Sequence, residues 1–323
     1  MNQTNIQTNI QTSTRRTPRH QSSSINRPRR RAGFSLLALG LGASLMLGGC
    51  DSFGPSISQQ RLMEVPHIAG STMRVESANG WIEVVTVDRP DVSILVNLRG
   101  HSFERLDLTT VRAHRLDDGT LRVWVEWPGG IRKNGEGASV SIEVPDVNGI
   151  EAHSSNGHIL IAGLSGRAEL ITTNGRIEVQ THDGSLYADS SNGDLKAEHV
   201  SGEIEMYSSN GRIIITDAFG PIRAETSNGN VYVSTMDGNE GPLRIRTSNG
   251  RVDLDLGEGF IGVLRAHTSN GKVQVAGLEG ANLIESTGHS VELRVDDSEQ
   301  ISDIRTSNGS VRVQGRHTEP SGG

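Results

Sequence analysis

The sequence predicts an all-β protein, a single-stranded parallel β-helix in which successive coils of the chain stack into a rod. Three observations favour this fold: a tetrapeptide of two Ser or Thr residues followed by Asn-Gly recurs, its period is nearly constant, and an alternating apolar run lies on each side of it. The intervals are 18 residues from Asn156 to Asn228, then 21 residues twice. A period near 20 residues is typical of a solenoid. The asparagines of the full copies and of one degenerate early copy are Asn79, Asn156, Asn174, Asn192, Asn210, Asn228, Asn249, Asn270 and Asn308.

Each repeat is expected to form strand, turn, strand, turn. In one repeat, Leu186 and Ala188 alternate before Asn192-Gly193, Leu195 and Ala197 alternate after it, and Gly202 marks the second turn. Asn-Gly takes positive φ at low cost, so it also fits a β-hairpin, and a meander of hairpins is the alternative fold. A meander does not require the same motif at every second turn, which favours the β-helix. The preference of parallel crossovers predicts a right-handed coil.

The side chains of the tetrapeptide are expected to line one edge of the core. By strand alternation, the Ser or Thr two residues before each asparagine points inward, as Ser190 does before Asn192, and the asparagine is expected to point inward with it. Stacked at the strand spacing, these hydroxyls and amides would bond to the coils above and below. The nine asparagines are therefore predicted to form a structural turn ladder without a catalytic role.

The first 49 residues are interpreted as a disordered leader followed by a signal peptide. A cluster of arginines precedes an apolar run over residues 32–47, which ends in small residues before the only cysteine, Cys50. This arrangement resembles the lipobox of bacterial lipoproteins. The resemblance implies cleavage before Cys50, a diacylglycerol on its sulfur, further acylation such as palmitate, and a place at the cell membrane facing the periplasm or the exterior. An uncleaved anchor with a buried Cys50 is the alternative.

Charge limits the partners of the mature chain. Residues 1–49 contain seven arginines and no acidic residue, so their removal changes the net charge from −7 to −7 − 7 = −14. This balance argues against a nucleic acid partner and favours membrane contact through the lipid.

The rest of the chain divides by pattern. Residues 50–69 are expected to be a tether, residues 70–149 a first coil with a β-rich N-terminal cap, residues 150–314 the β-helix repeats, and residues 315–323 a disordered tail. A worn copy of the turn is expected at Gly288-His289. The last coil is expected to have no cap, which would leave an edge open to a partner.

One segment carries a family resemblance. Val144-Pro145 precedes an alternating strand with Asn156-Gly157, and Gly163-Leu164-Ser165-Gly166 follows. Together with the repeated turns, this resembles the putative-adhesin family of bacterial envelope β-helix proteins over about residues 70–315. The resemblance implies a β-helix that binds or adheres at the envelope.

The sequence contains no pattern typical of catalysis. It has no His-x-x-x-His spacing, no Gly-x-Ser-x-Gly and no phosphate loop, and outward positions such as Arg176, Asp194 and Arg212 alternate in sign. We therefore expect a non-catalytic binding, adhesion or scaffolding module without cofactor or metal, with a glycan or an envelope protein as its partner. The alternative is a polysaccharide lyase or hydrolase, which would need carboxylate and basic side chains to converge on one face of a sheet.

Overall fold

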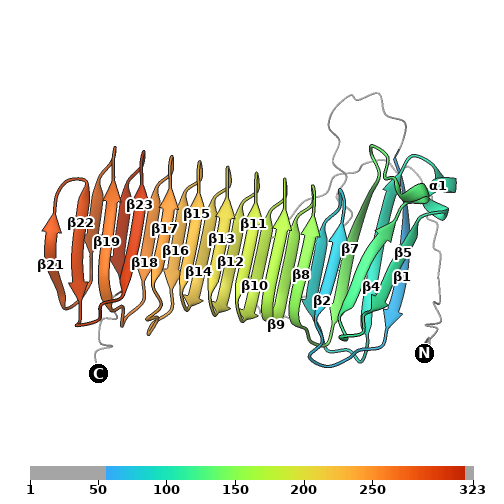
Figure 1. Ribbon diagram of the computed structural model, residues 1–323, viewed down its shortest axis with the longest axis horizontal. Helices are drawn as coiled ribbons and strands as arrows, with labels where there is room; N and C mark the ends of the chain where they lie inside the picture. Colours follow the sequence, from blue (N-terminus) through green and yellow to red (C-terminus); the bar gives the residue numbers. More distant parts are fainter. Residues whose placement is uncertain (1–55, 317–323) are drawn as a thin grey trace, which may run out of the picture.

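The computed structural model describes residues 56–316 and shows an elongated all-β rod (Figure 1). The expected signal peptide, Cys50 and the end of the expected tail, residues 317–323, lie outside the described residues. Within them, each regular coil contributes one strand to each of two facing sheets. The fold is thus a β-solenoid, as the repeats predicted, while the handedness of the coil stays a prediction.

The first sheet collects the strands that precede the Asn-Gly turns. Its spatial order is β5 (Thr110–Arg115), β6 (Leu121–Glu126), β2 (Met73–Ser77), β8 (Asn148–Ser154), the second half of β9 (Ile159–Thr172), β11 (Leu186–Ser190), β13 (Ile204–Ser208), β15 (Ile222–Thr226), β17 (Leu243–Thr247), β23 (Ile301–Thr306), β19 (Gly262–Thr268), β22 (Ser290–Val295) and β21 (Ala281–Ser286).

The second sheet collects the strands that follow the turns. Its order is β1 (Ile57–Val65), β4 (Val92–Gly100), β7 (Gly137–Val144), β3 (Ile82–Thr86), the first half of β9, β10 (Ile177–Asp183), β12 (Leu195–Ser201), β14 (Ile213–Phe219), β16 (Val231–Thr235), β18 (Val252–Leu256), β24 (Val311–Gly315) and β20 (Val273–Ala276).

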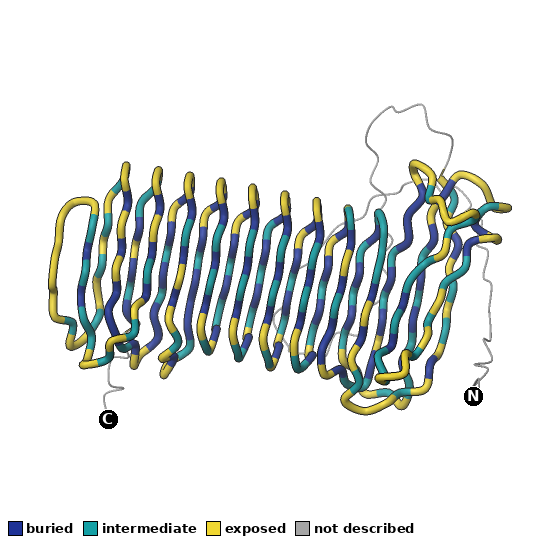
Figure 2. The backbone as a smooth tube through the Cα atoms, in the orientation of Figure 1, coloured by how far each residue is buried: buried dark blue, intermediate teal, exposed yellow. Residues whose placement is uncertain are grey.

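Equal repeat length places equivalent residues beside each other in parallel. Leu186 pairs with Ile204 in the first sheet, and Ile177 pairs with Leu195 in the second. Buried residues alternate with less buried ones along the strands (Figure 2), so the apolar side chains of both sheets meet in one narrow core. Outward ion pairs join neighbouring coils, as predicted for Arg212 with Asp194 at 2.6 Å.

The N-terminal end extends both sheets with antiparallel strands. β4 pairs antiparallel with β7, β1 pairs antiparallel with β4, and β5 pairs antiparallel with β6. The short helix α1 (Phe103–Asp107) begins at Ser102, whose side chain accepts a hydrogen bond from the Arg105 amide, and a 3-10 turn, η1 (Pro128–Gly130), follows β6. β1 corrects the tether expected over residues 50–69, because residues 57–65 belong to a strand. A capping role for this region stays a prediction.

The Asn-Gly turns differ from the expected turn in backbone conformation. Among the nine asparagines of the repeat, only Asn79 has a positive φ, of 55°. Glycine is instead required by close stacking: a Cβ on Gly193 would lie 1.7 Å from the carbonyl oxygen of Gly175 in the preceding coil. The glycines therefore stack backbone on backbone, and no other residue fits between the coils.

Positive φ appears at the second turn of the coil. Thr181, His199 and Asp217 hold equivalent positions with φ of 54°, 53° and 51°. Each is followed three residues later by a glycine whose φ is also positive, as in Gly202 at 133°. The bend that reverses the chain between β12 and β13 is built here.

The last coil is out of sequence order. The coil of β23 and β24 lies between the coil of β17 and β18 and the coil of β19 and β20, so residues 301–315 fill a gap that the chain leaves after Leu256 (Figure 1). The expected repeat at Gly288-His289 is wrong, because β21 and β22 form an antiparallel hairpin there. Gly315, assigned to the tail, ends β24.

Candidate functional site

The hydroxyl ladder of the Asn-Gly turns is buried, as predicted. From Ser154 onward, the Ser or Thr two residues before each asparagine donates to a glycine carbonyl of the neighbouring coil: Ser190 Oγ lies 2.9 Å from the Gly175 oxygen, and Thr226 Oγ1 lies 3.0 Å from that of Gly211. Ser77, before Asn79, donates to the Ala138 oxygen instead. The Gly193 amide donates in turn to Ser190 Oγ at 3.0 Å. Each buried hydroxyl of the ladder thus donates a hydrogen bond, and Ser154, Ser190 and Ser208 also accept one, which offsets the cost of burying them.

The asparagine ladder lies outside the core, which corrects the expectation that the amides point inward. Eight of the nine asparagines are exposed, and Asn79 is half-buried. From Asn156 onward, each Nδ2 donates to the Oδ1 of the neighbouring coil, as Asn192 does to Asn174 at 2.8 Å, whereas Asn79 Nδ2 donates to the Glu136 carbonyl at 3.2 Å. The alternation of buried and exposed residues does not continue through the turn: after the buried Ser190, both Ser191 and Asn192 are exposed, and Gly193 is the next buried residue. The remaining bonds join Asn156 to Asn79, Asn174 to Asn156, Asn210 to Asn192, Asn228 to Asn210, Asn249 to Asn228, Asn308 to Asn249 and Asn270 to Asn308.

Both ladders bond each coil to the next. The order in which the amides bond places Asn308 between Asn249 and Asn270, in agreement with the displaced position of the last coil. An amide bonded on both sides uses one N–H and one acceptor site within the ladder, so the ladder joins successive coils. A more strongly charged surface lies elsewhere on the rod.

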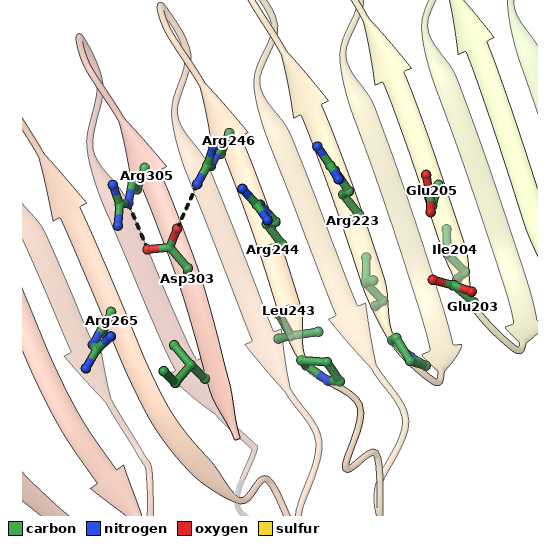
Figure 3. Close-up of a pocket in the computed structure, with 14 residues that line it drawn as sticks. Glu203, Ile204, Glu205, Arg223, Leu243, Arg244, Arg246, Arg265, Asp303 and Arg305 are labelled. Atoms are coloured by element: carbon green, nitrogen blue, oxygen red, sulfur yellow. Dashed lines mark hydrogen bonds and ion pairs between the residues drawn. The ribbon is translucent and has the colours of Figure 1, made fainter. Parts of the chain in front are cut away.

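The outer surface of the first sheet carries a cluster of cations near the C-terminal end. We call it the arginine face. Four neighbouring strands, β15, β17, β23 and β19, supply it, and their guanidinium groups stand on the same side of the sheet (Figure 3). Its members are Arg223, Arg244, Arg246, Arg265 and Arg305.

Carboxylates lie beneath these arginines. Asp303 forms ion pairs with Arg246 at 3.2 Å and with Arg305 at 2.8 Å (Figure 3). Its side chain is 19% exposed, whereas that of Arg305 is 57% exposed. Glu225 forms an ion pair with Arg223 at 2.9 Å, and Glu292 forms one with Arg265 at 3.2 Å. The five arginines of the face thus share three carboxylates, an excess of two positive charges. Because the carboxylates are the more buried partners, the guanidinium groups meet solvent first.

Two adjoining hollows follow this surface. One, of about 530 Å³, spans β13 to β19, and the other, of about 550 Å³, borders the turns of the same strands; Arg246 and Arg305 line both. Glu203 and Glu205 line the first hollow at β13. The groove is therefore cationic over β15 to β19 and acidic at β13.

Aromatic rings stand at the acidic end. The rings of Tyr187 and Tyr207 lie 5.7 Å apart at 43°, and the guanidinium of Arg223 lies 5.5 Å from the Tyr207 ring. The Tyr207 hydroxyl donates to Glu205 at 2.7 Å. Burial, together with this hydrogen bond to an anion, raises the pKa of Tyr207 well above its usual range. Tyr207 is therefore a poor proton acceptor at neutral pH, while its ring remains available for stacking.

The displaced last coil completes the arginine face. It inserts Asp303 between Arg244 and Arg265 and places Arg305 beside Arg246. The sequence-based expectation that outward charges do not pool is wrong for this face. The expectation depended on the positions after each asparagine, whereas Arg223, Arg244 and Arg265 recur five residues before Asn228, Asn249 and Asn270. The sequence repeat therefore predicts these three arginines on one face, but it does not predict that Asp303 and Arg305 lie among them.

Residues 56–316 contain no group of three or more His, Cys, Asp or Glu side chains that is placed to hold a metal ion. No helix in the same range is long and apolar enough to cross a bilayer.

Comparison with known proteins gives likenesses in structure and none in sequence. No known family pattern matches the chain, and no curated protein matches it. A putative adhesin from Bacteroides fragilis is 13% identical with a TM-score of 0.42, over 81% of this chain and 97% of its own. A putative adhesin from Parabacteroides distasonis is 10% identical with a TM-score of 0.33, over 80% and 97%. A putative cell adhesion protein from Clostridium sporogenes is 9% identical with a TM-score of 0.26, over 80% and 100%.

These solved structures are described as putative adhesins, which is also the family that the repeats of this sequence resemble. At such identities and TM-scores, the likeness does not assign a family or a role to this chain. The proposal for its function therefore depends on the arginine face.

Proposed function

We propose that the protein is a lipid-anchored binding module of the bacterial cell envelope, which holds an acidic polysaccharide on the arginine face without chemical turnover. The observation that carries this proposal is the groove itself. Its two hollows are lined by guanidinium groups that can bind carboxylate or sulfate, by carboxylates that can accept hydrogen bonds from sugar hydroxyls, and by Tyr207, whose ring lies beside that of Tyr187. A linear chain of charged sugars would lie across several strands and contact all three.

The electrostatics of the groove favour binding over catalysis. Asp303 contacts two guanidinium groups, Arg246 through Oδ2 and Arg305 through Oδ1, so both of its carboxylate oxygens are already engaged. The raised pKa of Tyr207 keeps its hydroxyl protonated at neutral pH, so this side chain does not act as a base there. Arginine side chains stay protonated, so they attract anions and do not exchange protons at neutral pH.

The test is a double substitution, Arg246→Ala with Arg305→Ala, assayed by retention of the protein on immobilised polygalacturonate or heparin. Each guanidinium–carboxylate bond contributes about 1.5–3 kcal/mol, so we expect affinity to fall at least tenfold. The matched control is Arg176→Ala with Arg212→Ala, which removes the same charge from the second sheet. An equal loss of glycan affinity in both variants would show that only the overall charge matters, and it would refute the arginine face as the binding site.

A second function is favoured by one observation, the convergence of Asp303 with Arg246 and Arg305 on one sheet face (Figure 3). That is the arrangement that a polysaccharide lyase or hydrolase would require. Incubation of the purified protein with the same acidic glycans separates the two functions. New chain ends that appear with the native protein and not with Arg305→Ala would assign catalysis, and retention without new ends would assign binding.

Attachment to the membrane through Cys50 is tested separately. A Cys50→Ala variant lacks the thiol to which the diacylglycerol would be attached, so we expect the protein to move from the membrane fraction to the soluble fraction after cell breakage. Fractionation followed by immunoblotting measures this, with Ser52→Ala as the control for a change close to the cleavage site. A Cys50→Ala protein that is still anchored would exclude the lipid anchor and leave the arginine face unaffected.

A further inference from the structure

The two sheets end at different places at the C-terminal end of the rod. Among the described strands, β20 forms a ladder with β24 alone and ends the second sheet; at its first residue the Val273 amide donates to the Gly288 carbonyl at 3.3 Å, and the rest of this edge is free. The first sheet continues past β19 through β22 to β21. We call β22 and β21, residues 281–295, the overhang, because the longer sheet projects beyond the shorter one (Figure 1).

The apolar core stops abruptly under the overhang. Leu264 of β19, Leu293 of β22 and Leu283 of β21 form one inward row across three strands, and they are 0%, 5% and 65% exposed. A hollow of about 700 Å³ opens between the overhang and β20, with Val273, Val275 and Leu278 on its other side. An exposed leucine on the buried side of a sheet indicates that an opposing layer is missing.

We propose that two copies of the chain join tail to tail at this end, each overhang supplying the strands that the shorter sheet of the other copy lacks. A two-fold axis parallel to the strands exchanges the first and second sheets and keeps the direction of every strand. It therefore brings β21 of one copy to the free edge of β20 of the other copy. Such an isologous contact closes after two subunits.

Strand directions agree with this joint. β21 runs antiparallel to β22, which runs antiparallel to β19, so β21 has the direction of the first sheet. β20 has the direction of the second sheet, and the two sheets run oppositely (Figure 1). β21 of one copy and β20 of the other would thus pair as antiparallel strands. The bulge between Leu283 and Glu285 limits the pairing to a few residues, which suits the four residues of β20.

Charge is complementary across the joint. On the outer surface, Glu285 of β21 has no ion-pair partner among the described residues, nor do Lys272, directly before β20, and Arg312 of β24. The two-fold arrangement places Glu285 of one copy on the same outer surface as Lys272 and Arg312 of the other. The hollow is lined by apolar side chains of the overhang and of β20, among them Leu283, Leu293 and Val275. A second copy offers the same apolar surface and the complementary charges together, so it fits the hollow.

The test is sedimentation equilibrium of the mature protein in mild detergent. We expect a monomer–dimer equilibrium for the native chain and at least tenfold weaker dimerisation for Leu283→Glu, because a charge would enter the joined core. Leu108→Glu is the matched control, since Leu108 is 64% exposed at the opposite end of the rod and should not change the dimer. A native chain that is monomeric at all concentrations, or a dimer that Leu283→Glu leaves intact, would overturn the proposal.

A second measurement identifies the strands that meet. A Gln274→Cys protein is mixed with a differently tagged Glu285→Cys protein and treated with a short bismaleimide. We expect a crosslink between the two tags, and none when Glu178→Cys replaces Glu285→Cys. Crosslinking of equal yield in both mixtures would place the contact elsewhere and contradict the tail-to-tail joint.

Discussion

Gly193→Ala is expected to destabilise the rod by about 3 kcal/mol, the upper range for forcing extra atoms into a packed interior. The new methyl would lie 1.7 Å from the Gly175 oxygen, 2.4 Å from its carbon and 2.8 Å from Ser190 Oγ. The first two are backbone atoms, so the coils themselves must separate. That movement would also lengthen the Ser190 bond and the neighbouring asparagine bonds. Urea unfolding followed by circular dichroism measures the change in the free energy of unfolding.

The control for this substitution is Gly288→Ala. Nothing lies within 4 Å of a Cβ built at Gly288, in the hairpin between β21 and β22, and its φ is outside the left-handed region. Its free energy of unfolding should therefore stay close to that of the native chain. Similar losses in both variants would mean that glycine serves chain flexibility and not close stacking of the coils.

A chain that ends after Gln300 is expected to lose the folded structure of its C-terminal coils, from β17 to β22. It would lack β23 and β24, and with them the buried Ile304, Val311 and Val313. Three such side chains contribute about 5–9 kcal/mol together, which is comparable to the whole stability of many domains. β17 and β19 would also lose the strand that joins them. Hydrogen exchange should show residues 243–295 unprotected while β10 to β14 stay protected.

An internal deletion of similar size gives the control. Removal of residues 193–210 takes out one 18-residue repeat and joins Asn192 to Gly211, so the strands on either side can pair in the same register. This chain should unfold cooperatively and form a rod that is shorter by one coil, about 4.8 Å. If both deletions fold equally well, the last coil is only one more repeat and does not lock its neighbours together.

The local parts of this fold follow from the sequence because they repeat. Alternation around Asn192 and Asn210 predicted both strands of the coil, and the position of Ser190 predicted the buried hydroxyl ladder. The outward direction of the amides could not be obtained in this way, because the parity of a strand does not continue through a turn. The non-sequential coil was also hidden, since Asn308 carries the same motif as its neighbours and nothing local to it specifies between which coils it lies.

The arginine face was predictable in part for the same reason. Arg223, Arg244 and Arg265 share one repeat position, so their surface was encoded in the period. Arg305 and Asp303 joined them through pairing between segments nearly 60 residues apart in the chain, which depends on the energy of the whole assembly. Sequence patterns describe neighbours along the chain well and describe such long-range choices poorly.

The displaced last coil also sets a time order on assembly. Synthesis from the N-terminus delivers residues 301–315 after all the other described strands, yet these residues belong between two coils that emerged earlier. Until they arrive, β17 and β19 each present an unpaired edge that proteases and chaperones can recognise. The rod therefore closes only after synthesis has passed Gly315, and a product that terminates earlier remains open to degradation.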